Sequence, residues 1–247
     1  MNWNDSFWVL IDGRSITCLT LPTELNKTMK YFITATGTEI GKTYLCCEMI
    51  KYLRNRGDKV RAIKPVISGF DINRKDYDLD ADNVKILESL GLTLNKKNLE
   101  EVSPFSFPYP ASPDIAARYD NLPYVDYDWL LAYCKKFLAD SNDYAFIEGV
   151  GGIMVPLNKD KLILDLIKDL NISVILVAGN YLGTLSHTLS ALKVLERDNI
   201  KVNQLVVNDI NNDDVTLKQN LDSLNNFYNG TISSLKLDTL ERVVGRL

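Results

Sequence analysis

Short apolar runs alternate along the chain with stretches in which apolar residues recur every three or four positions. Five runs rich in β-branched and aromatic residues, apolar on both faces, are predicted strands: 31–34, 60–63, 144–147, 174–178 and 204–207. Six periodic stretches are predicted helices: 43–56, 82–90, 126–139, 162–170, 184–198 and 214–227. Strands that are apolar on both faces are typical of a parallel sheet with helices on each side. The alternation therefore predicts a doubly wound α/β fold with a mostly parallel sheet.

In a fold of this kind, ligands bind at the carboxyl ends of the strands, so the chemistry is expected just after each predicted strand. The length of 247 residues suits one large domain. Residues 1–28 differ from the rest, because they hold two of the three tryptophans and show no clear period. We expect them to be an N-terminal extension that is either disordered or not natively translated, with translation starting at Met29. Residues 29–247 are expected to form the single domain.

Charge and composition exclude several classes of function. A net charge of -4 provides no basic field for nucleic acid. The longest apolar strand-like run, ISVILVAG at 172–179, is far shorter than the roughly 20 residues that a membrane span needs. The four cysteines show no C-x-x-C spacing, and the N-terminus has no basic segment ahead of an apolar one. We therefore expect a cytoplasmic protein that binds neither nucleic acid nor membrane.

The segment ATGTEIGKT follows the first predicted strand and opens the first predicted helix. It misses the strict pattern G-x-x-x-x-G-K-[ST], because Thr36 stands where the first glycine belongs. The context is nevertheless that of a phosphate-binding loop: backbone N–H groups and the helix dipole attract phosphate, Lys42 adds a charge, and the Thr43 hydroxyl suits Mg²⁺. The segment predicts a nucleoside triphosphate site. The alternative is an ordinary glycine-bearing turn.

Charged residues follow the next two predicted strands. Lys64 ends the second strand, where it is either a solvated lysine or a charge that stabilises a transferred phosphoryl group. Glu148 ends the third strand ahead of three glycines, where it is either an exposed side chain or a ligand that holds Mg²⁺ opposite Thr43. Asp82 opens a predicted helix as its N-cap or as a further metal ligand, and Asp80 competes for that role.

Weaker signals follow the last two predicted strands. The helix start at 183–186 is a candidate anion site, since helix N-termini attract negative charge. His187, the only histidine, is expected to have a packing or surface role. Asn208 carries an amide with donors and an acceptor, which suits the edge of a purine.

Taken in order, the segments YFITATGTEIGKT, IKPVISG, PFSFPYPASPDIAA, IEGVGGIMVPL and VILVAGNYLGTLSHTLSA followed by VVND resemble the dethiobiotin synthetase family. The likeness runs from about residue 29 to 209. It implies a dimeric fold of the P-loop NTPase type, with ATP and Mg²⁺ as cofactors and with 7,8-diaminononanoate and CO₂ as substrates. The implied reaction closes a cyclic urea through a carbamate and a carbamic-phosphoric anhydride.

The resemblance also implies roles for individual residues. The catalytic charges are Lys42 and Lys64, and the Mg²⁺ ligands are Thr43, Asp82 and Glu148. The nucleotide contacts are Glu39, Ile40, Gly41, Lys42, Thr43, Tyr44, Glu148, Gly151 and Asn208. The substrate contacts are Ser68 and Gly149 and, from the opposite subunit, Gly183, Thr184, Leu185 and Ser186.

The sequence departs from the family pattern at Ala35, where an early glycine is usual, at Gly37, where aspartate is frequent, and at Val150, where alanine is common. The tail beyond Asn211 matches poorly, which leaves its nucleotide contacts open. Two rivals remain. A cobyrinate-type amidoligase usually carries a glutamine-hydrolysing domain with a Cys/His pair, for which this chain is too short. A partitioning-type ATPase carries a signature lysine where Gly37 stands, and the N-K-x-D motif of GTPases does not occur.

Overall fold

A sheet of six parallel strands forms the centre of the computed structural model, which describes residues 6–11, 15–20, 29–74, 76–140, 143–209 and 216–236. The strand order is β10-β9-β8-β3-β7-β4. The strands are β3 (Met29–Ala35), β4 (Val60–Ile63), β7 (Tyr144–Glu148), β8 (Ser173–Gly179), β9 (Val202–Asp209) and β10 (Ile232–Lys236). All neighbouring pairs are parallel, which confirms the predicted doubly wound sheet.

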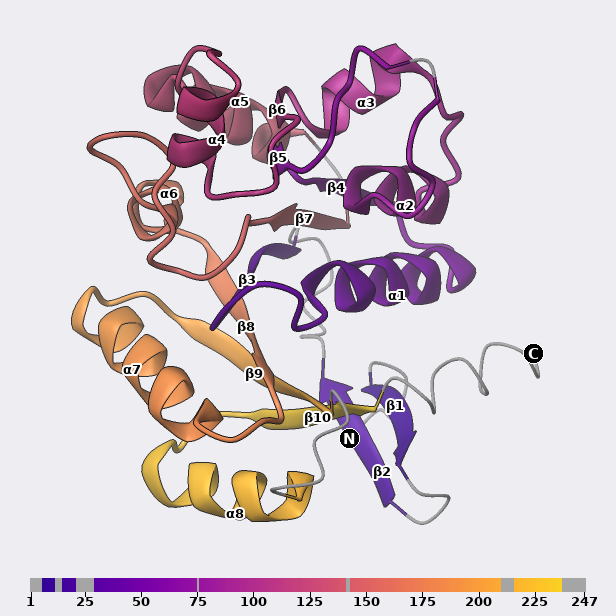
Figure 1. Cartoon of the computed structure of the whole chain (residues 1–247). Helices are drawn as coiled ribbons and strands as arrows, with labels where there is room; N and C mark the ends of the chain where they lie inside the picture. Colours follow the sequence, from indigo (N-terminus) through magenta and orange to yellow (C-terminus); the bar gives the residue numbers. More distant parts are fainter. Residues whose placement is uncertain are drawn as a thin grey trace.

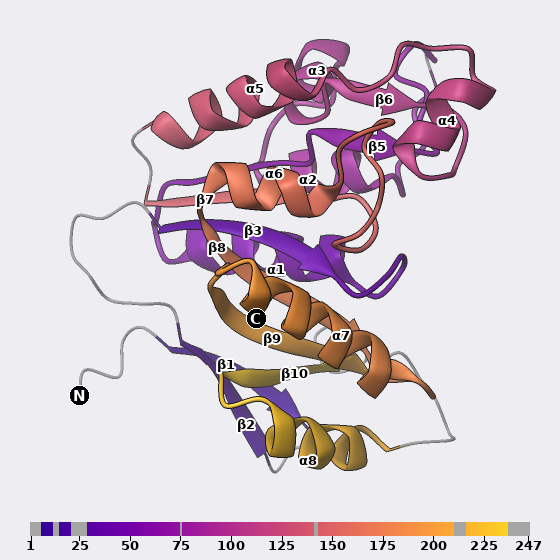
Figure 2. The same ribbon diagram turned by 90° about the vertical axis from the view of Figure 1, so that its left-hand side faces the viewer.

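Helices cover both faces of this sheet (Figures 1 and 2). One layer contains α1 (Lys42–Asn55), α2 (Asp82–Ser89) and α3 (Lys96–Val102). The other contains α4 (Pro113–Tyr119), α5 (Tyr127–Ala139), α6 (Ile163–Leu170), α7 (Thr184–Arg197) and α8 (Leu217–Phe227). The six helices predicted from periodicity are therefore confirmed, with ends that differ by a few residues.

Alternation along the strands divides the apolar core in two. On β3, Phe32 packs into the core beneath the α4–α8 layer, whereas its neighbours Tyr31 and Ile33 face the α1–α3 layer. On β8, Leu176 and Val177 divide in the same way. All five side chains are at most 2% exposed. Because successive side chains of a strand point to opposite faces, a strand buried on both sides has to be apolar throughout.

The structure also contains short elements that the hydrophobic pattern did not predict. The three-residue strands β5 (Val66–Ser68) and β6 (Phe105–Phe107) pair in parallel beside the main sheet. An antiparallel hairpin of β1 (Ser6–Ile11) and β2 (Ser15–Thr20) lies against β10. This hairpin falls within the predicted N-terminal extension, whose other residues lie outside the described part. Whether the extension is natively translated stays a prediction.

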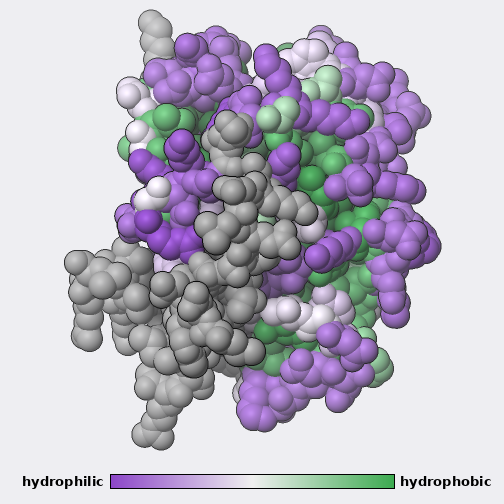
Figure 3. Space-filling view, turned by 180° about the vertical axis from the view of Figure 1, so that it is seen from behind, coloured by the Kyte–Doolittle hydropathy of each residue, from purple (hydrophilic) through white to green (hydrophobic). Residues whose placement is uncertain are grey.

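Hydrophilic side chains surround smaller apolar areas on the face opposite to that of Figure 1 (Figure 3). The exposed large apolar side chains of the described residues include Tyr119, Leu182 and Phe227. Within the described ranges, every helix is too short or too polar to cross a membrane.

Candidate active site

The predicted phosphate-binding loop connects β3 to α1 at the carboxyl edge of the sheet. Gly41 caps the helix with a φ of 95°, a left-handed conformation that glycine adopts without strain. A Cβ atom at this position would lie 2.4 Å from the amide nitrogen of Asn208, so the close approach also requires glycine. Ala35 is the last residue of β3, and its methyl group is buried in the core. The alanine that replaces the family glycine therefore lies in the strand, before the turn begins, where its side chain packs without affecting the turn.

Lys42 is held over this loop. Its side chain is buried, and its Nζ donates a hydrogen bond to the carbonyl oxygen of Gly37 at 3.2 Å. Burial, followed by repulsion from Lys64, lowers the pKa of Lys42 to about 8. An ammonium group that is desolvated and repelled in this way gains from any bound anion, which suits a polyphosphate. The Gly37 contact carried no signal in the sequence, because it uses only the backbone.

Glu148 is the point at which the predicted site residues meet. It ends β7, is fully buried, and accepts hydrogen bonds on Oε1 from the Thr43 hydroxyl at 2.6 Å and from Lys64 Nζ at 2.7 Å. Its second oxygen, Oε2, is buried and has no hydrogen-bond partner among the described residues. A buried carboxylate with one oxygen left over is costly unless another ligand completes its coordination.

Lys64 joins β4 and α2 to Glu148. Its Nζ also donates to Asp82 Oδ2 at 2.6 Å, and the lysine side chain is only 4% exposed. Burial opposes the charge of Lys64, but the carboxylates of Glu148 and Asp82 outweigh it and raise the pKa above the ordinary value. Burial likewise opposes the charge of Asp82, yet Lys64 lowers the pKa of that carboxyl. The ammonium of Lys64 and the carboxylate of Asp82 are therefore ionised near neutral pH.

The residues predicted to hold Mg²⁺ fit a magnesium ion. Thr43, Asp82 and Glu148 offer oxygen atoms within one cluster that is buried at Thr43 and Glu148 and open to solvent at Asp82, whose side chain is 42% exposed. Glu148 Oε2 is an acceptor in need of a partner. The described residues form no cluster of three or more His, Cys, Asp or Glu that would hold a metal unaided. Mg²⁺ typically binds to one or two carboxylates and completes its shell with phosphate and water, so two carboxylates and a hydroxyl suffice. Asp80, by contrast, is 91% exposed and pairs with Lys85 at 3.3 Å.

The glycines after β7 bring a second loop against the phosphate loop. Ile153 donates a backbone hydrogen bond to Ala35 at 3.2 Å. A Cβ atom at Gly149 would lie 2.8 Å from the Phe32 ring, and one at Gly151 would lie 2.7 Å from Val155. These glycines are therefore required by packing, and they let the loop approach the site closely.

The remaining predicted nucleotide contacts occupy different environments. Ile40 is buried, and its carbonyl accepts a hydrogen bond from Asn208 Nδ2 at 3.1 Å, while Asn208 Oδ1 is buried and lacks a partner among the described residues. Glu39 is exposed with a φ of 57°, and Tyr44 is half-buried. Ser68, a predicted substrate contact, is half-buried at the end of β5.

The four substrate contacts predicted at 183–186 lie at the start of α7, after β8. Thr184 is buried and donates its hydroxyl to the carbonyl of Gly179 at 2.5 Å, so its side chain caps the turn. Gly183 caps the helix with a φ of 98°, Leu185 is half-buried, and Ser186 is exposed. In the sheet order, β3 lies between β8 and β7, and both β3 and β7 lie between β8 and β4. The turn is thus distant in the sheet from the Lys64 cluster of the same chain.

A buried amide network beside Asn208 was missed from the sequence. Asn180, just after β8, donates to Asp209 Oδ1 at 3.0 Å and accepts from Asn220 of α8 at 2.6 Å. Asn residues near strand ends are usually read as turn formers, so the pattern carried no signal for this network. His187 meets the Tyr181 hydroxyl at 2.8 Å on the exposed side of α7.

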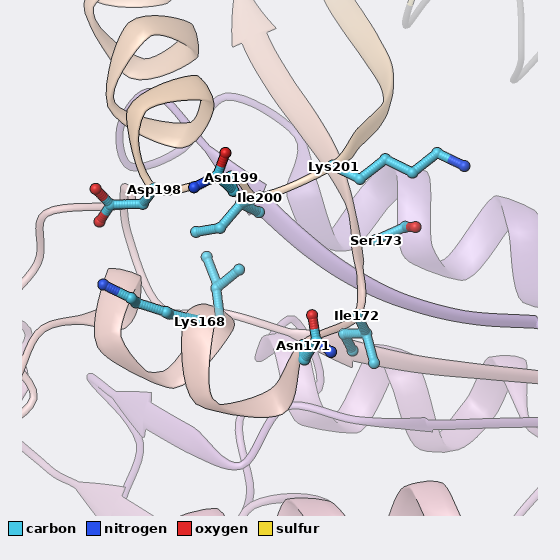
Figure 4. A pocket seen from close by; sticks show the side chains of 9 residues that line it. Lys168, Asn171, Ile172, Ser173, Asp198, Asn199, Ile200 and Lys201 are labelled. Atoms are coloured by element: carbon cyan, nitrogen blue, oxygen red, sulfur yellow. The ribbon is translucent and has the colours of Figure 1, made fainter.

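A cavity of about 380 Å³ lies away from these residues (Figure 4). It is formed by the connections α6–β8 and α7–β9, with Ile167, Lys168, Ser173, Ile200 and Lys201 among its walls. These connections precede β8 and β9, so the cavity lies at the amino ends of the strands, opposite to the phosphate loop. It is no part of the candidate active site.

Fold and site together define an enzyme of the P-loop nucleotide-dependent class. An ATP-dependent dethiobiotin synthetase of Phenylobacterium zucineum is 37% identical over 179 residues, covering 72% of this chain and 75% of the relative. Another, of Legionella pneumophila, is 33% identical over 221 residues, covering 85% of this chain and 99% of the relative. The chain belongs to the family of ATP-dependent dethiobiotin synthetases.

Two further comparisons agree with the fold. A family model described as an AAA domain matches residues 29–247. The solved MinC:MinD cell division protein complex of Aquifex aeolicus superimposes with a TM-score of 0.50 at 14% identity, covering 83% of this chain and 79% of the solved one. A likeness at this identity shows a shared fold and nothing about activity.

The lowered pKa of Lys42 predicts a pH-dependent stability. Between about 8 and 10.5, the folded and unfolded values for this group, the unfolded chain binds more protons, so the stability of the native protein rises with pH. Without nucleotide at pH 7, we expect Lys42→Met to be more stable than the parent by on the order of 1–3 kcal/mol, with the difference shrinking as the pH rises through that window. Urea unfolding across the pH range measures it, with exposed Lys193→Met as the control; a difference independent of pH would contradict the prediction.

Proposed function

We propose that this chain converts 7,8-diaminononanoate, CO₂ and ATP into dethiobiotin, ADP and phosphate. The observation that carries the proposal is that Thr43 and Lys64 both donate to the buried Glu148 beside a phosphate-binding loop, with Asp82 joined to them through Lys64. Such a site combines a polyphosphate cradle with a second buried ammonium that phosphate binding alone does not need. Membership of the synthetase family gives that second charge a reaction to serve.

The reaction proceeds in three steps. One amine of the diamine adds to CO₂ and loses a proton, which gives a carbamate whose negative charge Lys64 stabilises. A carbamate oxygen then attacks the γ-phosphorus of ATP and ADP leaves, while Lys42 neutralises the phosphate oxygens. The second amine attacks the carbonyl carbon of the resulting carbamic-phosphoric anhydride and loses a proton, and phosphate leaves as the cyclic urea closes.

The protein's part in these steps is positioning and charge stabilisation. Holding the second amine beside the anhydride provides an effective concentration that solution cannot reach. Mg²⁺ held by Thr43, Asp82 and Glu148 would supply positive charge to the oxygens of the β- and γ-phosphates. Neither lysine acts as a covalent nucleophile in this scheme.

The remaining contacts follow from the same proposal. Asn208 reads the adenine edge, Ser68 and Gly149 contact the diamine, and the chain works as a homodimer. The carboxylate of the diamine binds at the start of α7 of the second copy, where the helix N-terminus at 183–186 is exposed apart from Thr184 and the half-buried Leu185. Three buried free cysteines, Cys46, Cys47 and Cys134, suit a reducing cytoplasm.

A direct assay tests the proposal. The purified protein is mixed with 7,8-diaminononanoate, bicarbonate, ATP and Mg²⁺, and dethiobiotin is measured by mass spectrometry. We expect product, and we expect Lys64→Met to lower kcat/KM about 10²- to 10³-fold, because it removes a charge that acts on the transition state. Lys193→Met on the exposed face of α7 is the matched control. Absence of product from the parent protein would contradict the proposal, and ATP hydrolysis stimulated instead by DNA or membranes would favour a partitioning-type switch.

Variants of Asp82 and Asp80 test whether Asp82 is a metal ligand or only a surface charge. We expect Asp82→Asn to raise the Mg²⁺ concentration for half-maximal activity at least about tenfold, since it removes a charged oxygen ligand. Asp80→Asn changes the same chemical group two residues earlier, at an exposed position, and should leave that concentration unchanged. Equal effects in the two variants would remove Asp82 from the proposed ligand set.

Hybrid dimers test whether α7 of one copy serves the site of the other. Ser186→Asp places a carboxylate where the substrate carboxylate is proposed to bind, and it should inactivate the dimer through like-charge repulsion. Mixed in equal amounts with inactive Lys64→Met, it should restore about a quarter of the parental activity, because half of the dimers carry one intact site. No recovery after mixing and subunit exchange would mean that each chain builds its site alone.

A further inference from the structure

The ammonium group of Lys64 lies among the oxygens that suit a magnesium ion. Its Nζ is 2.6 Å from Asp82 Oδ2 and 2.7 Å from Glu148 Oε1. The Thr43 hydroxyl lies 2.6 Å from that same Glu148 oxygen. These donors and acceptors come from β4, α2, β7 and α1, so the cluster is assembled by the whole fold rather than by one flexible loop.

Because the cluster is largely buried, Lys64 and a divalent ion cannot occupy this position at the same time. The side chains of Lys64 and Glu148 are 4% and 0% exposed, so water screens their charges very little, whereas Asp82, 42% exposed, lies on the solvent side of the cluster. A divalent ion that reached the same oxygens would meet the lysine charge at close range with little dielectric between them. Without any cation, in turn, the fully buried carboxylate of Glu148 would be an unpaired charge in the core, which is strongly unfavourable.

We propose that Lys64 is an exchangeable resident cation: it neutralises Asp82 and Glu148 until Mg²⁺ arrives with the nucleotide, and it is then displaced towards the carbamate. That the displaced lysine moves towards a carbamate rests on the proposed function. The exchange makes metal binding and the positioning of Lys64 a single event. Only the metal-loaded site presents a free ammonium to the substrate, so the nucleotide is not activated before the charge for the carbamate is ready.

Metal titration without nucleotide tests the competition. Mn²⁺ binding is followed by electron paramagnetic resonance for the parent, Lys64→Met and Lys42→Met. We expect Lys64→Met to bind Mn²⁺ at least about tenfold more tightly than the parent, because the competing ammonium is gone. Lys42→Met removes an equal charge from the neighbouring phosphate loop, but one that contacts the Gly37 carbonyl, and should change the affinity much less. Unchanged or weaker binding by Lys64→Met, or an equal gain in both variants, would overturn the exchange.

A measurement on the parent protein guards against loss of folding in Lys64→Met. The buried, hydrogen-bonded ammonium of Lys64 should give a resolved ¹H–¹⁵N signal, assigned by its absence in Lys64→Arg. We expect this signal to shift or vanish when Mg²⁺ and a non-hydrolysable ATP analogue are added together, and to persist with the analogue and EDTA. A signal unchanged under saturating metal would refute the exchange. Neither experiment uses the diamine, so dethiobiotin formation with an immobile Lys64 would leave the proposed function standing.

Discussion

The buried carboxylate of Glu148 is the constraint on which the site depends. A fully buried charge at the end of an apolar strand is tolerated only if other groups compensate for it, and here a hydroxyl and an ammonium group do so. Those groups belong to the first turn of α1 and to the end of β4, so compensation of one charge fixes three elements relative to one another. Asp82 extends the same pairing to α2 through Lys64. The stability of this edge of the sheet and the geometry of the site therefore rest on the same contacts.

Strand order explains why these groups converge. β7 lies between β3, which leads into the phosphate loop, and β4, which is followed directly by Lys64. An acceptor at the end of the middle strand is within reach of both neighbours, and a lysine is long enough to span from the outer one. β4 does not adjoin β3, and Lys64 reaches the site through Glu148 on the strand between them.

The sequence predicted those parts of the fold whose pattern is long enough to carry a period. The five apolar runs and six amphipathic stretches are all present, and Thr43, Lys64, Asp82 and Glu148 form one cluster. The sequence did not predict β5 and β6, since strands of three residues are too short to show an alternation of apolar and polar positions. Nor did it predict the order of the strands, because parallel partners are chosen by long-range packing. The contact of Lys42 with the carbonyl of Gly37 could not be predicted from the sequence either, because every residue type has a backbone carbonyl.

The fold shared with a cell division protein does not explain what makes this site suited to synthesis. Part of the explanation is electrostatic. Lys42 already sits in a buried position where Lys64 opposes its charge, and its Nζ contacts the carbonyl of Gly37. A signature lysine of the partitioning type at position 37 would bring a third ammonium beside two that already repel each other. The chain instead has a glycine there and keeps its second cation on β4, among carboxylates that can release it. A charge held in that way is free to act on a substrate other than the nucleotide, which a synthetase requires and a nucleotide switch does not.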